Sequence, residues 1–195
     1  MPVPNVLRRI LSMLAKTLRF RARFEKRLKK VLEKGAAFEA RRRKARRRIT
    51  VFLLGPGFPR EQLAERKRLQ KQLRRYGINA IVMETLPQWT SPRITDKFRD
   101  ILSAFSPNVI VAIFTKRGKP LGVTFELGYL AGYYGVDKLR KMLAICVERG
   151  VDEIKLMTQY VRELLPENGR TFDRNQLLDT LLTIADDVAV ELDYL

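Results

Sequence analysis

Glu126 is the residue best placed to do chemistry in this chain of 195 residues. It is the one acid in the stretch 109–135, where the apolar run from Val109 to Phe114 predicts a buried strand. A polar loop and a Gly-punctuated apolar helix follow the strand. In open α/β sheets, ligands bind beyond the carboxyl ends of the strands, where such loops and helix N-termini converge. The sequence therefore predicts that the Glu126 carboxylate lies at a ligand site.

A carboxylate in this position can act on the anomeric carbon of a sugar. Cleavage there passes through an oxocarbenium-like transition state, which a carboxylate captures covalently or stabilises electrostatically while a second group protonates the leaving base. Glu84 and Asp96 are the candidates for the second acid. Tyr129, three residues after Glu126, is expected to orient it by hydrogen bonding. The alternative is that Glu126 only caps a helix or forms a salt bridge.

The composition limits other chemistries. The chain has no His, the commonest general base and metal ligand, and we expect no metal site. Its one Cys, Cys146, lies in an apolar run and cannot form an intrachain disulfide, which favours a cytoplasmic protein. No stretch reaches the roughly 18 apolar residues of a membrane span. No cofactor is indicated beyond a nucleotide ligand, and self-association into a homo-oligomer stays open.

The elements that must position Glu126 alternate in type from residue 49 on. Strands are expected at 49–54, 78–84, 108–114, 142–147 and, as a short edge strand, 170–172. Helices are expected at 60–76, 94–105, 123–134, 151–165 and 175–192, with the only Trp, Trp89, in the loop 87–92. In the helix at 60–76, Leu63, Leu69 and Leu73 are expected to face inward. The pattern predicts a three-layer α/β/α fold with a mostly parallel four- or five-stranded sheet.

The net charge of +18 is concentrated at the N-terminus. Residues 1–48 hold 18 of the 39 Lys and Arg residues but 3 of the 21 acidic residues, a net charge of +15 against +3 for residues 49–195. Apolar residues at spacings of three and four within 3–34 predict one or two amphipathic helices, the second of which Gly35 is expected to end. We therefore divide the chain into a basic helical arm, 1–48, and an α/β domain, 49–195.

Such a local excess of positive charge is an electrostatic footprint for a polyanion. We expect the arm to bind RNA or the ribosome, because Arg-rich helices that neutralise phosphates release counterions. The residues expected to bind RNA are Arg8, Arg9, Arg19, Arg23, Arg27, Arg41, Arg42, Arg43, Lys44, Arg46, Arg47 and Arg48. The alternatives are an anionic membrane surface, a targeting presequence and a solvated tail.

Two motifs in the expected α/β domain occur some 70 residues apart: Val51-Phe52-Leu53-Leu54-Gly55-Pro56-Gly57-Phe58 and Gly122-Val123-Thr124-Phe125-Glu126-Leu127-Gly128-Tyr129. Together they make residues 49–147 resemble the nucleoside 2-deoxyribosyltransferase family and its TIR-like relatives. That family opens with a strand ending in a Gly-Pro-aromatic loop and carries its nucleophilic glutamate at a similar helix start. The resemblance implies that Glu126 is the nucleophile. It also implies that Gly55, Pro56 and Phe58 line the sugar or base pocket. We further expect Gly57, Gly122 and Glu84 to contact the ligand.

The loop before Glu126 departs from the family pattern. The family has aspartates there that hold the sugar and the base, whereas this loop is Thr115-Lys116-Arg117-Gly118-Lys119-Pro120. We therefore expect Lys116, Arg117 and Lys119 to bind a phosphorylated or otherwise anionic ligand, such as a nucleotide, or RNA itself. The alternative is a solvent-facing turn.

The sequence supports two functions of different classes. The first is an RNA-binding, ribosome-associated protein with a nucleotide-binding-like domain as platform and the basic arm as anchor. The second is an enzyme that hydrolyses or transfers the N-glycosidic bond of a nucleoside, nucleotide or NAD, with Glu126 as nucleophile. We expect RNA binding to be the physiological role, because positive charge is concentrated in the arm and replaces acids in the loop.

Overall fold

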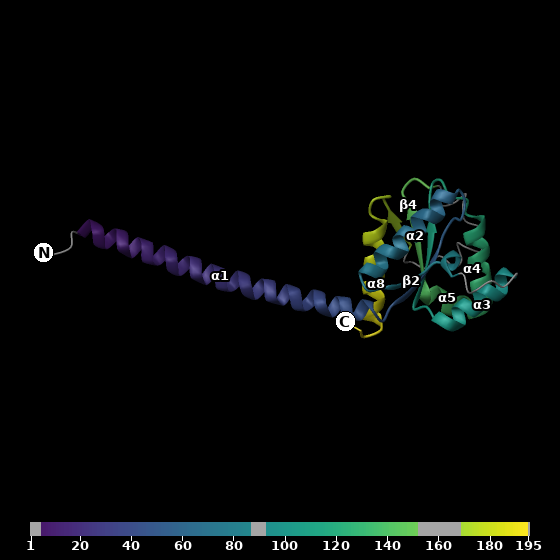
Figure 1. Ribbon diagram of the computed structural model, residues 1–195, viewed down its shortest axis with the longest axis horizontal. Helices are drawn as coiled ribbons and strands as arrows, with labels where there is room; N and C mark the ends of the chain where they lie inside the picture. The colour runs from purple at the N-terminus through teal and green to yellow at the C-terminus, as the bar shows by residue number, and fades with distance from the viewer. Residues whose placement is uncertain (1–4, 87–92, 152–168, 195) are drawn as a thin grey trace. The chain divides into compact units, whose positions relative to one another are not determined.

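The computed structural model describes residues 5–86, 93–151 and 169–194, and it describes side chains from residue 25 on. The chain divides into two compact units, Met1–Arg42 and Arg43–Leu195 (Figure 1). The boundary therefore lies six residues before the one expected from the charge pattern. The expected helix at 151–165, apart from Val151, and the loop of Trp89 lie outside the described residues.

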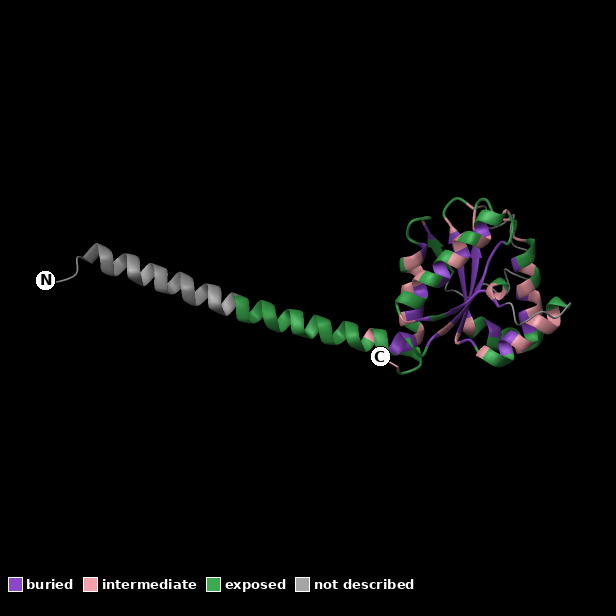
Figure 2. Cartoon of the chain, viewed as in Figure 1, coloured by how far each residue is buried: buried purple, intermediate pink, exposed green. Residues whose placement is uncertain are grey.

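Helix α1, Asn5–Arg46, forms the regular structure of the first unit, and its last four residues belong to the second. The helix continues through Gly35, so the expectation that Gly35 ends a helix is wrong. A single Gly costs a helix about 1 kcal/mol relative to Ala, which flanking helix formers such as Lys34 and Ala36 outweigh. From residue 25 to residue 41, every residue of α1 is exposed (Figure 2).

Five parallel strands form the sheet of the second unit. They are β1 (Thr50–Leu54), β2 (Asn79–Ile81), β3 (Val109–Phe114), β4 (Leu143–Glu148) and β5 (Arg170–Phe172). Their order across the sheet is β2-β1-β3-β4-β5, and each neighbouring pair is parallel. The predicted parallel sheet and the short strand at 170–172 are confirmed. Strand β2 is shorter than expected because the chain turns into a 3-10 helix, η1, at Met83–Thr85.

Helices cover both faces of this sheet and complete the predicted three-layer α/β/α fold (Figure 1). Helices α2 (Arg60–Arg75) and α8 (Leu177–Glu191) pack on one face. Helices α3 (Ile94–Phe105), α4 (Leu121–Tyr134) and α5 (Val136–Met142) pack on the other. Helix α5 was not expected, because seven residues are too few for a helical period to be visible in the sequence.

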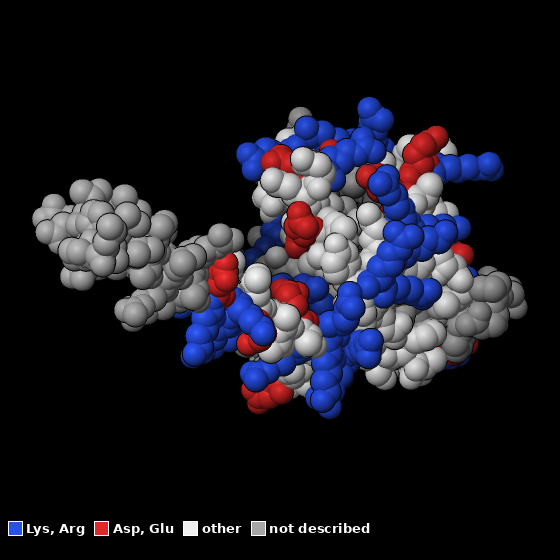
Figure 3. Space-filling view, turned by 60° about the vertical axis from the view of Figure 1, so that its left-hand side comes forward, with Lys and Arg blue, Asp and Glu red and all other residues white. Residues whose placement is uncertain are grey.

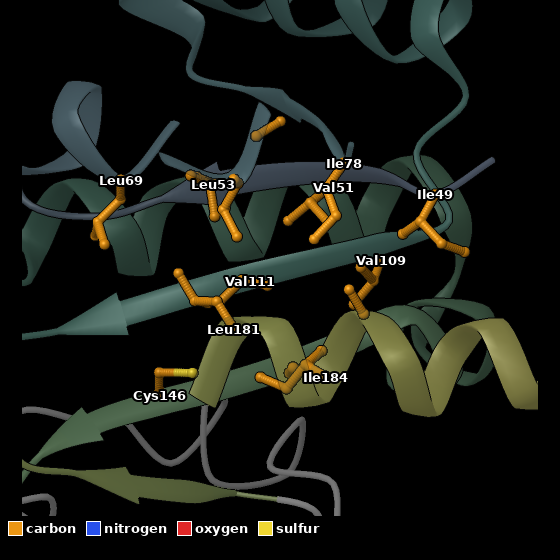
Figure 4. Packing of buried hydrophobic residues seen from close by; sticks show 14 of the residues in the cluster. Ile49, Val51, Leu53, Leu69, Ile78, Val109, Val111, Cys146, Leu181 and Ile184 are labelled. Atoms are coloured by element: carbon orange, nitrogen blue, oxygen red, sulfur yellow. The ribbon is translucent and has the colours of Figure 1, made fainter. Parts of the chain in front are cut away.

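The core is divided by the sheet into two clusters, since successive strand residues point to opposite faces. Phe52 and Leu54 of β1 belong to the cluster on the side of α3 and α4, while Val51 and Leu53 belong to the other. Figure 4 shows the second cluster, in which strand side chains and those of α8 point into one layer. Burial raises the pKa of the Cys146 thiol to about 12, so Cys146 is a packing residue and not a reactive thiol.

The end of α1 is part of the core of the second unit. Ala45 is 1% exposed and packs in the same cluster as Ile49. The Arg46 guanidinium, also buried, donates through Nε to Asp186 Oδ1 at 2.7 Å and through Nη2 to Asp186 Oδ2 at 2.8 Å. Arg46 therefore holds the fold together and is withdrawn from the set expected to bind RNA.

Within the described residues, none of the helices combines the length and the apolarity needed to cross a bilayer.

We predict that Asp186→Ala lowers the free energy of unfolding of the full chain by about 3 kcal/mol, because it strands the buried Arg46 cation. Asp187→Ala is the matched control. Asp187 pairs with Arg170 through side chains that are 48% and 43% exposed, and its loss should cost at most about 1 kcal/mol. Urea unfolding monitored by circular dichroism measures both, and equal losses would contradict the role given to Arg46.

Candidate functional site

The loops after β1 and β3 meet at the carboxyl edge of the sheet. In the order β2-β1-β3-β4-β5, the strand order reverses between β1 and β3, which is where doubly wound folds bind their ligands. A Cβ atom at Gly118 would overlap the ring of Pro56, and the Lys119 N–H donates to the Phe58 carbonyl at 3.3 Å. The structure thus brings together the two loops that the sequence singled out.

Arg66 of α2 lies across the end of β1, where Gly55 makes room for it. A Cβ atom at Gly55 would lie 2.7 Å from Arg66 Cδ, and the whole Arg66 residue is 4% exposed. Its Nη2 donates to Glu84 Oε1 at 2.7 Å. Glu84, predicted to be near the ligand, is therefore the counterion of a buried guanidinium.

Sequence reasoning missed Arg66 because α2 carries many charged residues and was assigned an apolar inner face only. The buried residues of α2 are Gln62, Arg66, Leu69, Gln70 and Leu73, whereas Leu63 is only partly buried. The three polar members follow the same helical spacing as Leu69 and Leu73. This shared spacing is the pattern in the sequence from which the polar part of the buried face of α2 could have been predicted.

The carboxyl group of Glu126 is largely shielded from solvent. Glu126 lies in the second turn of α4, and its Oε2 is enclosed without a hydrogen-bond partner in the described part of the chain. Burial raises the pKa of Glu126 from 4.5 to about 8; the nearby Arg66 lowers it and the nearby Glu84 raises it further. Glu126 is therefore mostly protonated at pH 7. Pro120, not Glu126, caps α4, so the helix-capping alternative does not apply.

Tyr129 does not orient Glu126. Its hydroxyl donates to the Thr95 carbonyl at 2.9 Å, and its ring lies 5.5 Å from that of Phe98. The single hydroxyl proton is thus used within the contact between α4 and α3, and the expected donation to Glu126 is wrong. Asp96, the other candidate second acid, pairs with Arg99 on α3 at 3.2 Å.

Of the remaining expected ligand residues, Phe58, Gly57 and Lys119 lie in the two loops, and Gly122 lies in the first turn of α4. Phe58 is 60% exposed, and Lys119 Nζ lies 5.0 Å from the centre of its ring. Cβ positions at Gly57 and Gly122 have no neighbouring atom within 4 Å, so nothing in the described structure requires glycine at either. These residues are accessible to a ligand but do not enclose one.

A cavity of about 170 Å³ lies beside the two loops, on the face of the sheet covered by α2 and α8. Pro56, Lys116, Arg117 and Arg66 are among its lining residues. Glu126 is not among them. The expectation that one cleft would hold both the loop cations and the Glu126 carboxylate is therefore corrected: Lys116 and Arg117 line a cavity that does not reach Glu126.

The donor set was also tested against metal binding. In the parts of the chain that the structure describes, no group of three or more His, Cys, Asp and Glu side chains is arranged to hold a metal ion.

The chain was then compared with known proteins. No protein-family model and no curated protein matches it.

We predict that the stability of the protein depends on pH through Glu126. The folded state holds its proton up to about pH 8, while the unfolded chain releases it near the ordinary pKa of 4.5. Between these values the folded state binds more protons, so wild-type stability falls as the pH rises. The variant Glu126→Gln lacks this group and should gain stability relative to the wild type from pH 5 to pH 8. Urea unfolding at both pH values measures it, and a constant difference would show that Glu126 titrates normally.

Proposed function

We propose that the chain is an RNA-binding protein, associated with the ribosome in the cytoplasm, that uses α1 as its anchor and the α/β unit as a platform. One observation carries this proposal: the Lys and Arg residues of α1 from residue 26 to residue 41 are all exposed, and three acids accompany them between residues 25 and 41. On the face shown in Figure 3, Lys and Arg side chains form continuous runs, and Asp and Glu side chains form smaller groups, some of them next to the basic ones. Exposed cations along a helix suit contact with successive phosphates.

The boundary between the two units, after Arg42, changes the net charge that belongs to each unit. Residues 1–42 carry a net charge of +10, and residues 43–195 carry +8. Arg43, Lys44, Arg47 and Arg48 are exposed but belong to the second unit. Arg42, in the first unit, pairs with Glu39 at 2.8 Å. The side chains of Arg8, Arg9, Arg19 and Arg23 lie outside the described part of the chain. Both units therefore contribute to the attraction of a polyanion.

We predict that neutralising the arm weakens RNA binding more than neutralising an equal charge elsewhere. The arm variant changes Arg27, Lys30, Lys34 and Arg41 to Gln, and the matched control changes Arg60, Arg68, Lys71 and Arg75 of α2, all exposed. The slope of log K against log salt for single-stranded RNA should fall by about 3 in the arm variant, since each lost phosphate contact removes about 0.7. The control should change the slope by less than about 1.

The RNA proposal has to be separated from binding to lipid. Leu28, Val31, Leu32 and Phe38 of α1 are between 46% and 65% exposed, and a lipid surface would cover such residues. The same two variants are therefore compared on ribosomal RNA, duplex RNA and vesicles containing phosphatidylserine. Equal loss of RNA affinity in both variants, or tight binding to vesicles with none to RNA, would overturn the proposal.

A second candidate function rests on the enclosed Glu126 Oε2 at the reversal point of the sheet. A buried polar atom without a partner calls for an explanation, and a carboxyl with a raised pKa beside a charged pair is typical of catalytic sites. In the proposed step, the Glu126 carboxylate forms a bond to the anomeric carbon as the C–N bond breaks and the base takes a proton. Water then displaces the carboxylate and releases the sugar. Glu84 forms the ion pair with Arg66 and is not available as proton donor, so in this step the departing base takes its proton from water.

We predict, for this second candidate, that base release from AMP, NAD or deoxyadenosine increases with pH up to about 8, because only ionised Glu126 is a nucleophile. Glu126→Gln should abolish the release. Glu61→Gln is the control, because Glu61 is an exposed acid at the start of α2. Chromatography of the free base measures the rate. Release that persists in Glu126→Gln would contradict the role of Glu126 as nucleophile, and no release from any of the three compounds would leave the α/β unit as a platform only.

A further inference from the structure

The cavity beside the two loops has an apolar wall of defined size. Leu69, Ile113, Phe172 and Leu177 line it, and all four belong to the core cluster between the sheet and helices α2 and α8. A cavity of about 150 Å³ with such a lining accommodates benzene. The volume of about 170 Å³ therefore suits one six-membered ring and is small for two fused rings.

A hydrogen-bond donor without a partner faces this cavity. The Gly118 N–H donates to Thr115 Oγ1 at 3.1 Å, and the Thr115 hydroxyl donates to Gln62 Oε1 at 2.6 Å. These two hydrogen bonds orient the Gln62 amide with Oε1 toward Thr115, and they do not use its NH₂ group. Gln62 lines the cavity and is 4% exposed, yet its amide nitrogen has no partner in the described part of the chain. Among the described residues this nitrogen is not one of the side-chain atoms enclosed without a partner, so it reaches the open space of the cavity and can donate to an acceptor on a ligand.

The mouth of the cavity favours an anion. Lys116 and Arg117 are exposed there, and neither forms an ion pair with another described residue. Of the acids at the mouth, Glu65 pairs with Arg174 at 3.3 Å, whereas Glu148 accepts only the uncharged Lys116 N–H, at 2.8 Å, so its carboxylate opposes one of the two cations. The Nη2 of Arg66 donates to Glu84, while its Nε is buried and has no hydrogen-bond partner in the described part of the chain. The cations Lys116 and Arg117 thus exceed the uncompensated carboxylate of Glu148 by one positive charge, which favours an anionic group.

We propose that this cavity binds a small anionic ligand with a single six-membered ring, of which a pyrimidine nucleoside monophosphate is an example. The ring packs against Leu69 and Phe172, a ring acceptor bonds the Gln62 amide, and the anionic group lies at Lys116 and Arg117. The site goes beyond the proposed function, because it uses neither α1 nor Glu126.

The full chain is titrated by calorimetry with uridine monophosphate, uridine, phenyl phosphate, adenosine monophosphate and inorganic phosphate. Uridine monophosphate should bind at least about tenfold more tightly than uridine or phosphate, since each of these lacks one of the two recognised parts. Adenosine monophosphate should bind more weakly, because its fused rings exceed the cavity. Phenyl phosphate has a six-membered ring without hydrogen-bond acceptors. Its affinity should therefore lie between those of uridine monophosphate and phosphate, and its difference from uridine monophosphate measures the hydrogen bonding of the ring.

Three variants localise the site. Gln62→Glu replaces the donor by an acceptor of the same shape, and Arg117→Ala removes a cation; each should weaken uridine monophosphate binding by about tenfold. Lys119→Ala is the matched control, because Lys119 belongs to the same loop but packs over Phe58 and does not line the cavity. It should leave the affinity within about twofold.

Two results would overturn the proposal. They are a failure of both uridine monophosphate and phenyl phosphate to bind, and equal losses of affinity in Arg117→Ala and Lys119→Ala. Arg117 is exposed, so Arg117→Ala tests the site even where Gln62→Glu lowers stability. RNA binding by α1 is measured separately, so failure here leaves the RNA proposal standing.

Discussion

The parallel pairing of β1 with β3 is the constraint on which the second unit depends. The two strands pair in register from Val51 with Val109 to Leu54 with Ala112. Parallel strands cannot be joined by a tight turn, so the intervening chain must cross over, and it does so through α2, β2 and α3. The same register ends both strands at one edge of the sheet. The loops 55–58 and 115–120, which follow these two strands, therefore lie at the same edge of the sheet.

The buried guanidinium of Arg66 organises that edge. Taking such an ion out of water costs several kcal/mol, of which the ion pair with Glu84 offsets a part, because the buried Arg66 Nε has no hydrogen-bond partner in the described part of the chain. Arg66 thus lies near two acids, Glu84 and Glu126, but it forms its ion pair with Glu84. Glu126, shielded from solvent and close to the Glu84 charge, keeps its proton. The same guanidinium lines the neighbouring cavity, so the position of α2 affects both sites.

The basic residues of this chain have two opposite uses. Along α1 from residue 26 to residue 41 they are exposed, and their charge is available to a polyanion. Arg46 and Arg66 are instead buried and paired with Asp186 and Glu84. Nothing about the residue type distinguishes the two uses. The distinction comes from whether the tertiary structure brings an acid within reach of a buried position.

Local patterns in the sequence were enough to predict most elements of the fold. Apolar runs and helical periods depend on neighbours along the chain, so β1, β3, β4, β5 and helices α2, α3, α4 and α8 were found within a few residues. The charge excess, the two loops and Glu126 as the acid after β3 are also properties of the sequence alone.

Other features follow only from contacts between distant residues. Tyr129 is hydrogen-bonded to Thr95, 34 residues away in the sequence, and Arg46 to Asp186, 140 residues away. No local pattern in the sequence could predict the partner of either side chain. The continuation of α1 through Gly35 shows that a local stop signal can be overruled by the helix around it. The order of the strands, the polar inner face of α2 and the separation of Glu126 from the cavity likewise depend on how the sheet assembles. The sequence by itself determined which elements form and where charge collects. The tertiary structure decided which side chains are buried together, because burial and pairing are set by residues far apart in the chain.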